Sequence, residues 1–200
     1  MRAALAVGIS LWVGLTSAAA VVLYGELEVS RAQRALEAGS PPSLHTSSSP
    51  ARAGVVNALR LARAAEAGGG ANRQQMLDRS IALIEQSSAE RPAWGEAALV
   101  RAYAHALRDG IGHPQTCRAL AASYHDAPFL RHAASWRVET SLACWGSLAV
   151  DARRAAVEEA VWLSRIAPES HPAILASMRG SEAYVPFVLR WRELRATDLH

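Results

Sequence analysis

Residues 74–103, QQMLDRSIALIEQSSAERPAWGEAALVRAY, decide the fold because they contain one helix, a break and the start of a second helix. Apolar Leu77, Ile81 and Ile84 recur at the three- and four-residue spacing of a single helix face. Pro92 then interrupts the pattern, since proline lacks a backbone N–H and disfavours helix in the residue before it. β-Branched residues do not alternate with polar ones here or elsewhere, so the pattern predicts helices and no strands.

The same alternation of helical patterns and Gly or Pro breakers continues on both sides of this stretch. Helices of about 10–18 residues joined by short turns are typical of stacked antiparallel helix pairs. The prediction is an all-α fold in which residues 51–200 form one helical-repeat domain. The expected helices are Ala51–Ala67, Asn72–Ser88, Pro92–Asp109, Pro114–Tyr124, Ala127–Trp145, Val150–Ala167, Pro172–Arg179 and a last one, capped by Ser181, through Leu194.

A family resemblance follows from the same stretch. The spacing of the second helix and closing proline of a tetratricopeptide unit is found at Ser80, Ile84, Ser87 and Pro92. The stretch after it resembles the opening helix of the next unit, at Trp94, Gly95, Ala98, Leu99 and Tyr103. The resemblance covers about residues 51–109, although the first hairpin lacks the aromatic signature. Residues 126–145 and 170–191 loosely resemble helical proteins of bacterial envelope-polysaccharide systems, which are often membrane-anchored and tetratricopeptide-like.

The N-terminal segment is free of charge over residues 3–25, AALAVGISLWVGLTSAAAVVLYG. As a helix, these residues span roughly 34 Å, which is enough to cross a hydrocarbon core of about 30 Å. The run continues through Tyr24, an interfacial type of residue, and this favours an uncleaved transmembrane signal-anchor over residues 1–25. A signal peptide cleaved at the small residues of 16–20 is the alternative. A buried core helix of a soluble protein is a third interpretation of this segment.

Orientation and the next segment follow from the flanking charges. Arg2 and the N-terminal amine are the nearest positive groups, which predicts a cytoplasmic N-terminus and places most of the chain in the periplasm, on a single pass through the inner membrane. Within residues 26–50, Glu26–Ala38 favours a helix and Gly39–Pro50, rich in Pro and Ser, reads as a flexible stalk.

Composition argues against nucleic-acid binding. The formal net charge is +3, and all 21 basic residues are arginine. Arginine suits phosphate recognition, but the arginines are spread along the chain and most lie near acidic residues. No basic stripe of the kind that tracks a nucleic-acid backbone is present in the sequence.

The two cysteines, Cys117 and Cys144, are both expected to point inward. Cys117 lies on the apolar face of its helix, and Cys144 lies on a stripe with Phe129, Ala133, Trp136 and Thr140. In an oxidising compartment they could form a disulfide. An antiparallel turn near Asp126 would instead place Cys117 nearer to Trp136, and free buried thiols are therefore the alternative.

The chemistry-bearing residues do not form a recognisable catalytic or metal motif. His113, His125 and His132 lie near Cys117 in sequence but without metal-ligand spacing, and His113 is expected to precede its helix. Glu158 and Glu159 are adjacent, so they point about 100° apart and are expected to form exposed ion pairs with nearby arginines. The sequence predicts no enzyme and no cofactor.

These observations favour a membrane-anchored, non-catalytic helical-repeat scaffold that binds a partner protein in the bacterial envelope. The resemblance implies a role in polysaccharide assembly or export. The candidate contacts to the partner are Arg101, His105, Arg108 and Trp162. The alternative is an accessory subunit of an integral membrane complex, held through its transmembrane helix, where Gly8 and Gly14 would allow close helix packing.

Overall fold

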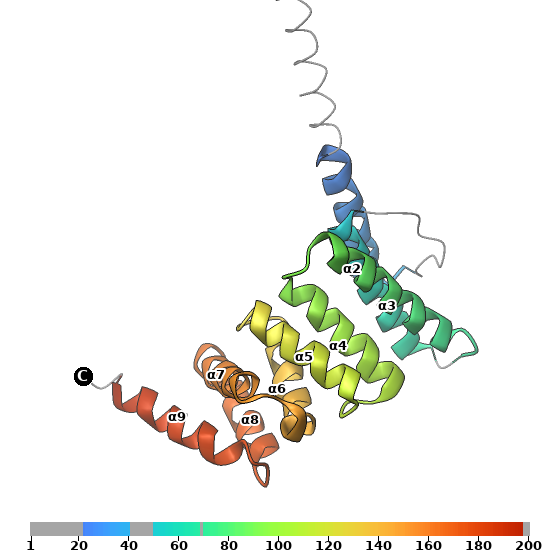
Figure 1. The fold of residues 1–200 in the computed structure, drawn as a ribbon. Coiled ribbons are helices and arrows are strands. Elements are labelled where there is room, and N and C mark those ends of the chain that lie inside the picture. Colours follow the sequence, from blue (N-terminus) through green and yellow to red (C-terminus); the bar gives the residue numbers. More distant parts are fainter. Residues whose placement is uncertain (1–21, 41–49, 69, 198–200) are drawn as a thin grey trace, which may run out of the picture.

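The computed structural model describes residues 22–40, 50–68 and 70–197, and the regular elements within them are all helical (Figure 1). The predicted all-α fold is therefore confirmed. Residues 22–37 are helical, and the elements after them are α2 (Ala51–Ala67), α3 (Arg73–Glu90), α4 (Gly95–Asp109), α5 (Pro114–Asp126), α6 (Ala134–Ala143), η1 (Trp145–Ser147), α7 (Val150–Ile166), η2 (Pro168–Ser170), α8 (His171–Met178) and α9 (Tyr184–Thr197).

Helices α2 to α5 lie side by side in chain order, and α2 also contacts α4 (Figure 1). Glycines permit two close approaches in this layer. A Cβ on Gly54 would lie 2.4 Å from the Ser87 Oγ of α3, and a Cβ on Gly95 would lie 3.0 Å from the backbone nitrogen of Ala127. The connections between these helices are short, and consecutive helices therefore run antiparallel, as predicted.

Helix α4 is shared between the buried clusters of the domain. Ala97 and Val100 belong to a cluster with α2 and α3, and Ala104 to a second cluster between the same helices. Ala102 instead belongs to a larger cluster formed with the helices from α5 to α9. Small residues on α4 therefore let it pack on both sides at once.

The helix of residues 22–37 packs on the domain. Val29 and Ala32 are buried, with 4% and 5% of their surface exposed. Glu26 forms an ion pair with Arg52 of α2 at 3.6 Å. The prediction of a helix over 26–38 is confirmed, but this helix contacts α2 and does not stand apart from the domain. Residues 41–49 of the predicted stalk lie outside the described residues.

Most of the predicted transmembrane segment also lies outside the described residues, and so do Gly8 and Gly14. Within the described part of the chain, no helix is long and apolar enough to cross a membrane. Val22, Leu23 and Tyr24, the first described residues, are exposed.

The helix predicted from Ala127 is wrong at its start, because α6 begins only at Ala134 and ends at Ala143. Pro128 lies in the irregular segment before it, and Phe129 is 48% exposed, so it does not belong to a buried stripe with Cys144. The buried face of α6 includes Arg137, which the stripe had left out.

The C-terminal helices close the other end of the array. Helix α7 contacts α6, α8 and α9, and α9 is at the end farthest from residues 22–37 (Figure 1). Ser181 does not cap α9 as predicted. Its hydroxyl donates to the carbonyl of Met178, and α9 begins three residues later at Tyr184.

Candidate functional site

A groove of about 530 Å³ lies between α2, α4 and the start of α6. Its floor is apolar, since Val55, Leu99 and Val100 are at least nine-tenths buried. Half-buried side chains form its sides and polar side chains its rim, so the groove combines an apolar interior with a charged edge. The lining residues are Val55, Val56, Leu59, Arg63, Glu66, Glu96, Leu99, Val100, Tyr103, His132, Ala133 and Trp136.

Tyr103 is the best fixed side chain on the sides of the groove. Its hydroxyl donates to Glu66 of α2 at 2.5 Å, and its ring meets the Trp136 ring edge to face, with centroids 5.8 Å apart. Burial is the main cause that raises the pKa of Tyr103, and the hydrogen bond to Glu66 adds to it. The phenol therefore stays protonated and joins α2, α4 and α6 across the groove.

The rim carries charges of both signs. Arg63 is exposed and has no hydrogen bond or ion pair within the described part of the chain. Glu96 accepts a hydrogen bond from the indole N–H of Trp94 at 3.3 Å. His132 is exposed at the far wall. A ligand in the groove thus meets a cation on α2 and an acid at the start of α4.

The segment of residues 127–133, which ends in the groove residues His132 and Ala133, is held by a buried ion pair. Arg137 Nε of α6 lies 3.2 Å from Glu159 Oε2 of α7, and both side chains are fully buried. Arg137 also donates to the carbonyl of Ala127 at 2.9 Å, and Glu159 accepts from the Leu130 N–H at 3.0 Å. The pair therefore fixes both ends of the turn that precedes His132.

The expectation of an exposed ion pair is wrong for Glu159, while Glu158 does form a partly exposed pair, with an arginine of another helix. Glu159 points into the core, and Glu158 pairs with Arg190 of α9 at 2.7 Å. Burial raises the pKa of Glu159 to about 7, although the Arg137 guanidinium and the Leu130 N–H oppose the shift. Helical periodicity places the two glutamates on different faces but does not reveal which face is covered.

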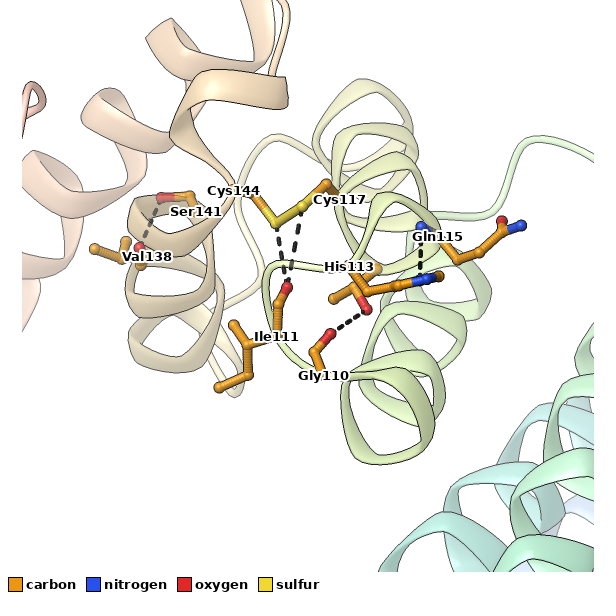
Figure 2. Close-up of a disulfide and its surroundings, with 9 residues drawn as sticks. Gly110, Ile111, His113, Gln115, Cys117, Val138, Ser141 and Cys144 are labelled. Atoms are coloured by element: carbon orange, nitrogen blue, oxygen red, sulfur yellow. Dashed lines mark hydrogen bonds between the residues drawn. A yellow bond between two sulfur atoms is a disulfide. The ribbon is translucent and has the colours of Figure 1, made fainter.

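Cys117 and Cys144 form a disulfide between the start of α5 and the residue after α6, with Cα atoms 5.4 Å apart (Figure 2). The carbonyl oxygen of Ile111 lies 3.4 Å from the Cys144 sulfur. The turn between the two cysteine-bearing helices was predicted near Asp126, which would have placed Cys117 beside Trp136. It is instead centred near Arg131, midway between the cysteines, so Cys117 meets Cys144. The bond fixes α6 against α5.

The polar residues proposed as partner contacts lie on α4 but bind within the domain. Arg101 donates to Ser88 of α3 at 2.7 Å, and Arg108 contacts Asp78 of α3 at 3.2 Å. His105 is 7% exposed, with Nδ1 3.0 Å from Asp109 Oδ2. None of these three residues lines the groove. They join α3 to α4.

Trp162, the other proposed contact, is half-buried on α7. Its ring lies against Phe129, with centroids 5.3 Å apart, and Ile166 one turn later is 38% exposed. The two rings form a small apolar surface outside the groove. The structure does not bring Trp162 together with Arg101, His105 or Arg108.

The histidines near the disulfide have structural roles or are exposed. His113 precedes α5 as predicted, and its Nδ1 accepts from the backbone N–H of Gln115 at 3.4 Å (Figure 2). His125 and His132 are exposed. Among the described residues, no three His, Cys, Asp or Glu side chains lie close enough together to hold a metal ion.

Sequence reasoning missed the groove because its lining comes from three helices that are distant in sequence. The available signal was the pair of aromatic residues Tyr103 and Trp136, which periodicity places in the core. No family model, curated protein or solved structure matches the chain. The tetratricopeptide resemblance therefore stays a prediction, and function is inferred from the geometry of this chain alone.

Proposed function

We propose that this protein is a non-catalytic helical scaffold that binds a segment of a partner protein in the α2–α4–α6 groove. The apolar groove with its charged rim is the single observation that carries the proposal. Its volume of about 530 Å³ accommodates a few partner side chains. Interfaces of this kind draw most of their binding energy from apolar anchors in pockets.

The chemistry of the groove defines the partner segment. Apolar side chains spaced along one face of a helix or an extended peptide would fill the space beside Val56, Leu59 and Trp136. An acidic residue on that segment would meet Arg63, and a basic one would meet Glu96. The partner is thus an amphipathic peptide segment with charges of both signs.

The cell envelope is the proposed location. The uncharged run of residues 3–25 supports attachment to the inner membrane, with the helical domain in the periplasm. A disulfide at Cys117 and Cys144 fits an oxidising compartment. The likeness of the later helices to envelope-polysaccharide proteins favours a role in polysaccharide assembly or export.

The test is co-purification of partner proteins from native membranes in mild detergent. Val56→Glu places a carboxylate in the groove, and Gln86→Glu places one on the exposed surface of α3 as the matched control. We expect Val56→Glu to lose partners that the wild type and Gln86→Glu retain. Equal recovery with both variants would exclude the groove as the binding site.

Exchange of the anchor distinguishes the groove-binding scaffold from the alternative function, an accessory subunit held through its membrane segment. If Ala3–Tyr24 is replaced by an unrelated transmembrane helix, the scaffold keeps its partner, because the groove is unchanged. Loss of the partner in this variant, with Val56→Glu still binding, would instead identify an accessory subunit held by its membrane segment.

A further inference from the structure

We infer that the helix of residues 22–37 is a rigid strut that holds the groove beside the membrane, so that the groove binds the juxtamembrane segment of an integral membrane protein. This inference rests on the proposed function and names the class of partner. Its basis is the way in which residues 22–40 pack along α2.

Contacts at several levels fix the strut to α2. At its start, a Cβ on Gly25 would lie 3.7 Å from Pro50, and the Glu26 carboxylate pairs with Arg52. Past its end, Arg60 donates to the carbonyl of Ser40 at 3.1 Å. Because the early residues contact the start of α2 and the late residue contacts a later turn, the two helices run in the same direction (Figure 1).

Buried side chains make the attachment rigid between these ends. Val29 and Ala32 lie one turn apart and are almost completely covered. Burial of apolar surface at this spacing opposes rotation and tilting of the helix on the domain. A domain joined only by a Pro/Ser-rich linker would have no such restraint.

The direction of α2 sets the height of the groove. The uncharged run ends at Gly25, beside the first turn of α2. The groove residues on α2 begin at Val55 and end at Glu66, which lie about 5 and 21 Å beyond Arg52 along the helix axis at 1.5 Å per residue. Measured along the α2 axis, the groove therefore lies within about 20 Å of the end of the apolar run.

Exposed apolar residues mark the membrane end of the strut. Val22, Leu23 and Tyr24 are 67%, 63% and 57% exposed, in direct continuation of residues 3–21. A lipid headgroup boundary is the environment that favours such a cluster, and tyrosine in particular. Helix α9 lies at the opposite end of the array and is therefore the natural distant reference site (Figure 1).

The experiment measures the height of the groove in vesicles of phosphatidylethanolamine and phosphatidylglycerol. The full chain carries one added cysteine, either Arg63→Cys at the groove or Arg192→Cys on α9, labelled with a donor dye. Cys117 and Cys144 are in the disulfide and do not react. We expect efficient energy transfer to a headgroup acceptor from position 63 and clearly weaker transfer from position 192.

Substitutions in the strut provide the matched comparison. Ala32→Glu places a charge in the interface with the domain, whereas Gln33→Glu places it on the exposed face of the same helix. We expect Ala32→Glu to reduce the difference between the two label positions and Gln33→Glu to preserve it. Equal transfer from positions 63 and 192 in the wild type, or no effect of Ala32→Glu, would overturn the inference.

The class of partner separates this inference from the proposed function. The partners whose recovery depends on Val56 are identified by mass spectrometry and are expected to contain a membrane-spanning segment. A soluble partner that depends on Val56 would overturn the strut inference and leave the proposed function standing. No dependence on Val56 would overturn the proposed function, whatever the height of the groove.

Discussion

At the scale of single residues, Arg137 is the side chain whose loss we expect to destabilise the fold most. It is the largest side chain that is fully buried in the described structure, it pairs with Glu159, and its guanidinium also lies 4.0 Å from the centroid of the Tyr124 ring. Removal of one partner from a buried pair leaves the other without compensation. We expect Arg137→Met to lower the free energy of unfolding by about 3–5 kcal/mol in urea titrations. Arg131→Met, at an exposed position, should change it by less than about 0.5 kcal/mol.

Glu159 makes stability depend on pH in a defined direction. Burial raises its pKa in the folded state to about 7, from an ordinary value of 4.5. Between these values the folded state binds more protons than the unfolded state, so this contribution to stability falls as pH rises from 4.5 to 7. Relative to Glu159→Gln, the wild type should lose stability across that window and no more above it, as measured by thermal melts at a series of pH values. If the wild type gains stability over this pH window, the Arg137 charge lowers the pKa of Glu159 by more than burial raises it.

Gly95 lies where α4 approaches the end of α5. A Cβ at this position would lie 3.0 Å from the backbone nitrogen and 3.2 Å from the Cα of Ala127, and neither atom moves freely. We expect Gly95→Ala to lower the free energy of unfolding by about 1–3 kcal/mol, although alanine favours helix. Gly146→Ala meets no atom within 4 Å and serves as the control, with no comparable loss.

At the scale of elements, the disulfide joins α5 to α6 across a loop of 27 residues. Loop-closure entropy assigns such a bond about 3–4 kcal/mol of stabilisation. The double variant Cys117→Ala/Cys144→Ala should lose about this amount in denaturant unfolding, and reduction of the wild type should produce a similar loss. Reductant should not affect the double variant, and an equal effect on both proteins would contradict the assignment.

Helix positions could be predicted wherever local pattern decides them. α2 begins and ends at the predicted residues, and α7 differs only at its last one, because glycine or proline follows an amphipathic run. The start of α6 could not be predicted. Arg137 and Glu159, which are 22 positions apart, bind the backbone of Ala127 and Leu130 ahead of the helix, and no local signal records this pairing.

At the scale of the molecule, the groove forms where the buried clusters meet at α4. Val55 and Val100 of its floor belong to the cluster of α2, α3 and α4, and Trp136 packs against the cluster of the later helices. The apolar residues of the groove are ordinary core residues in sequence, and only the arrangement of three helices leaves them open to a partner. The same arrangement explains why Arg101 and Arg108, which look available in the sequence, bind α3.

Photocrosslinking in native membranes tests the central claim most directly. A benzophenone amino acid at Leu59 places the reactive group in the groove, and the same amino acid at Gln86 places it on the outer face of α3. We predict partner adducts from position 59 that are absent from position 86 and are lost when Val56→Glu is added. Adducts of equal yield from both positions, or adducts from position 59 that survive Val56→Glu, would contradict a partner-binding groove.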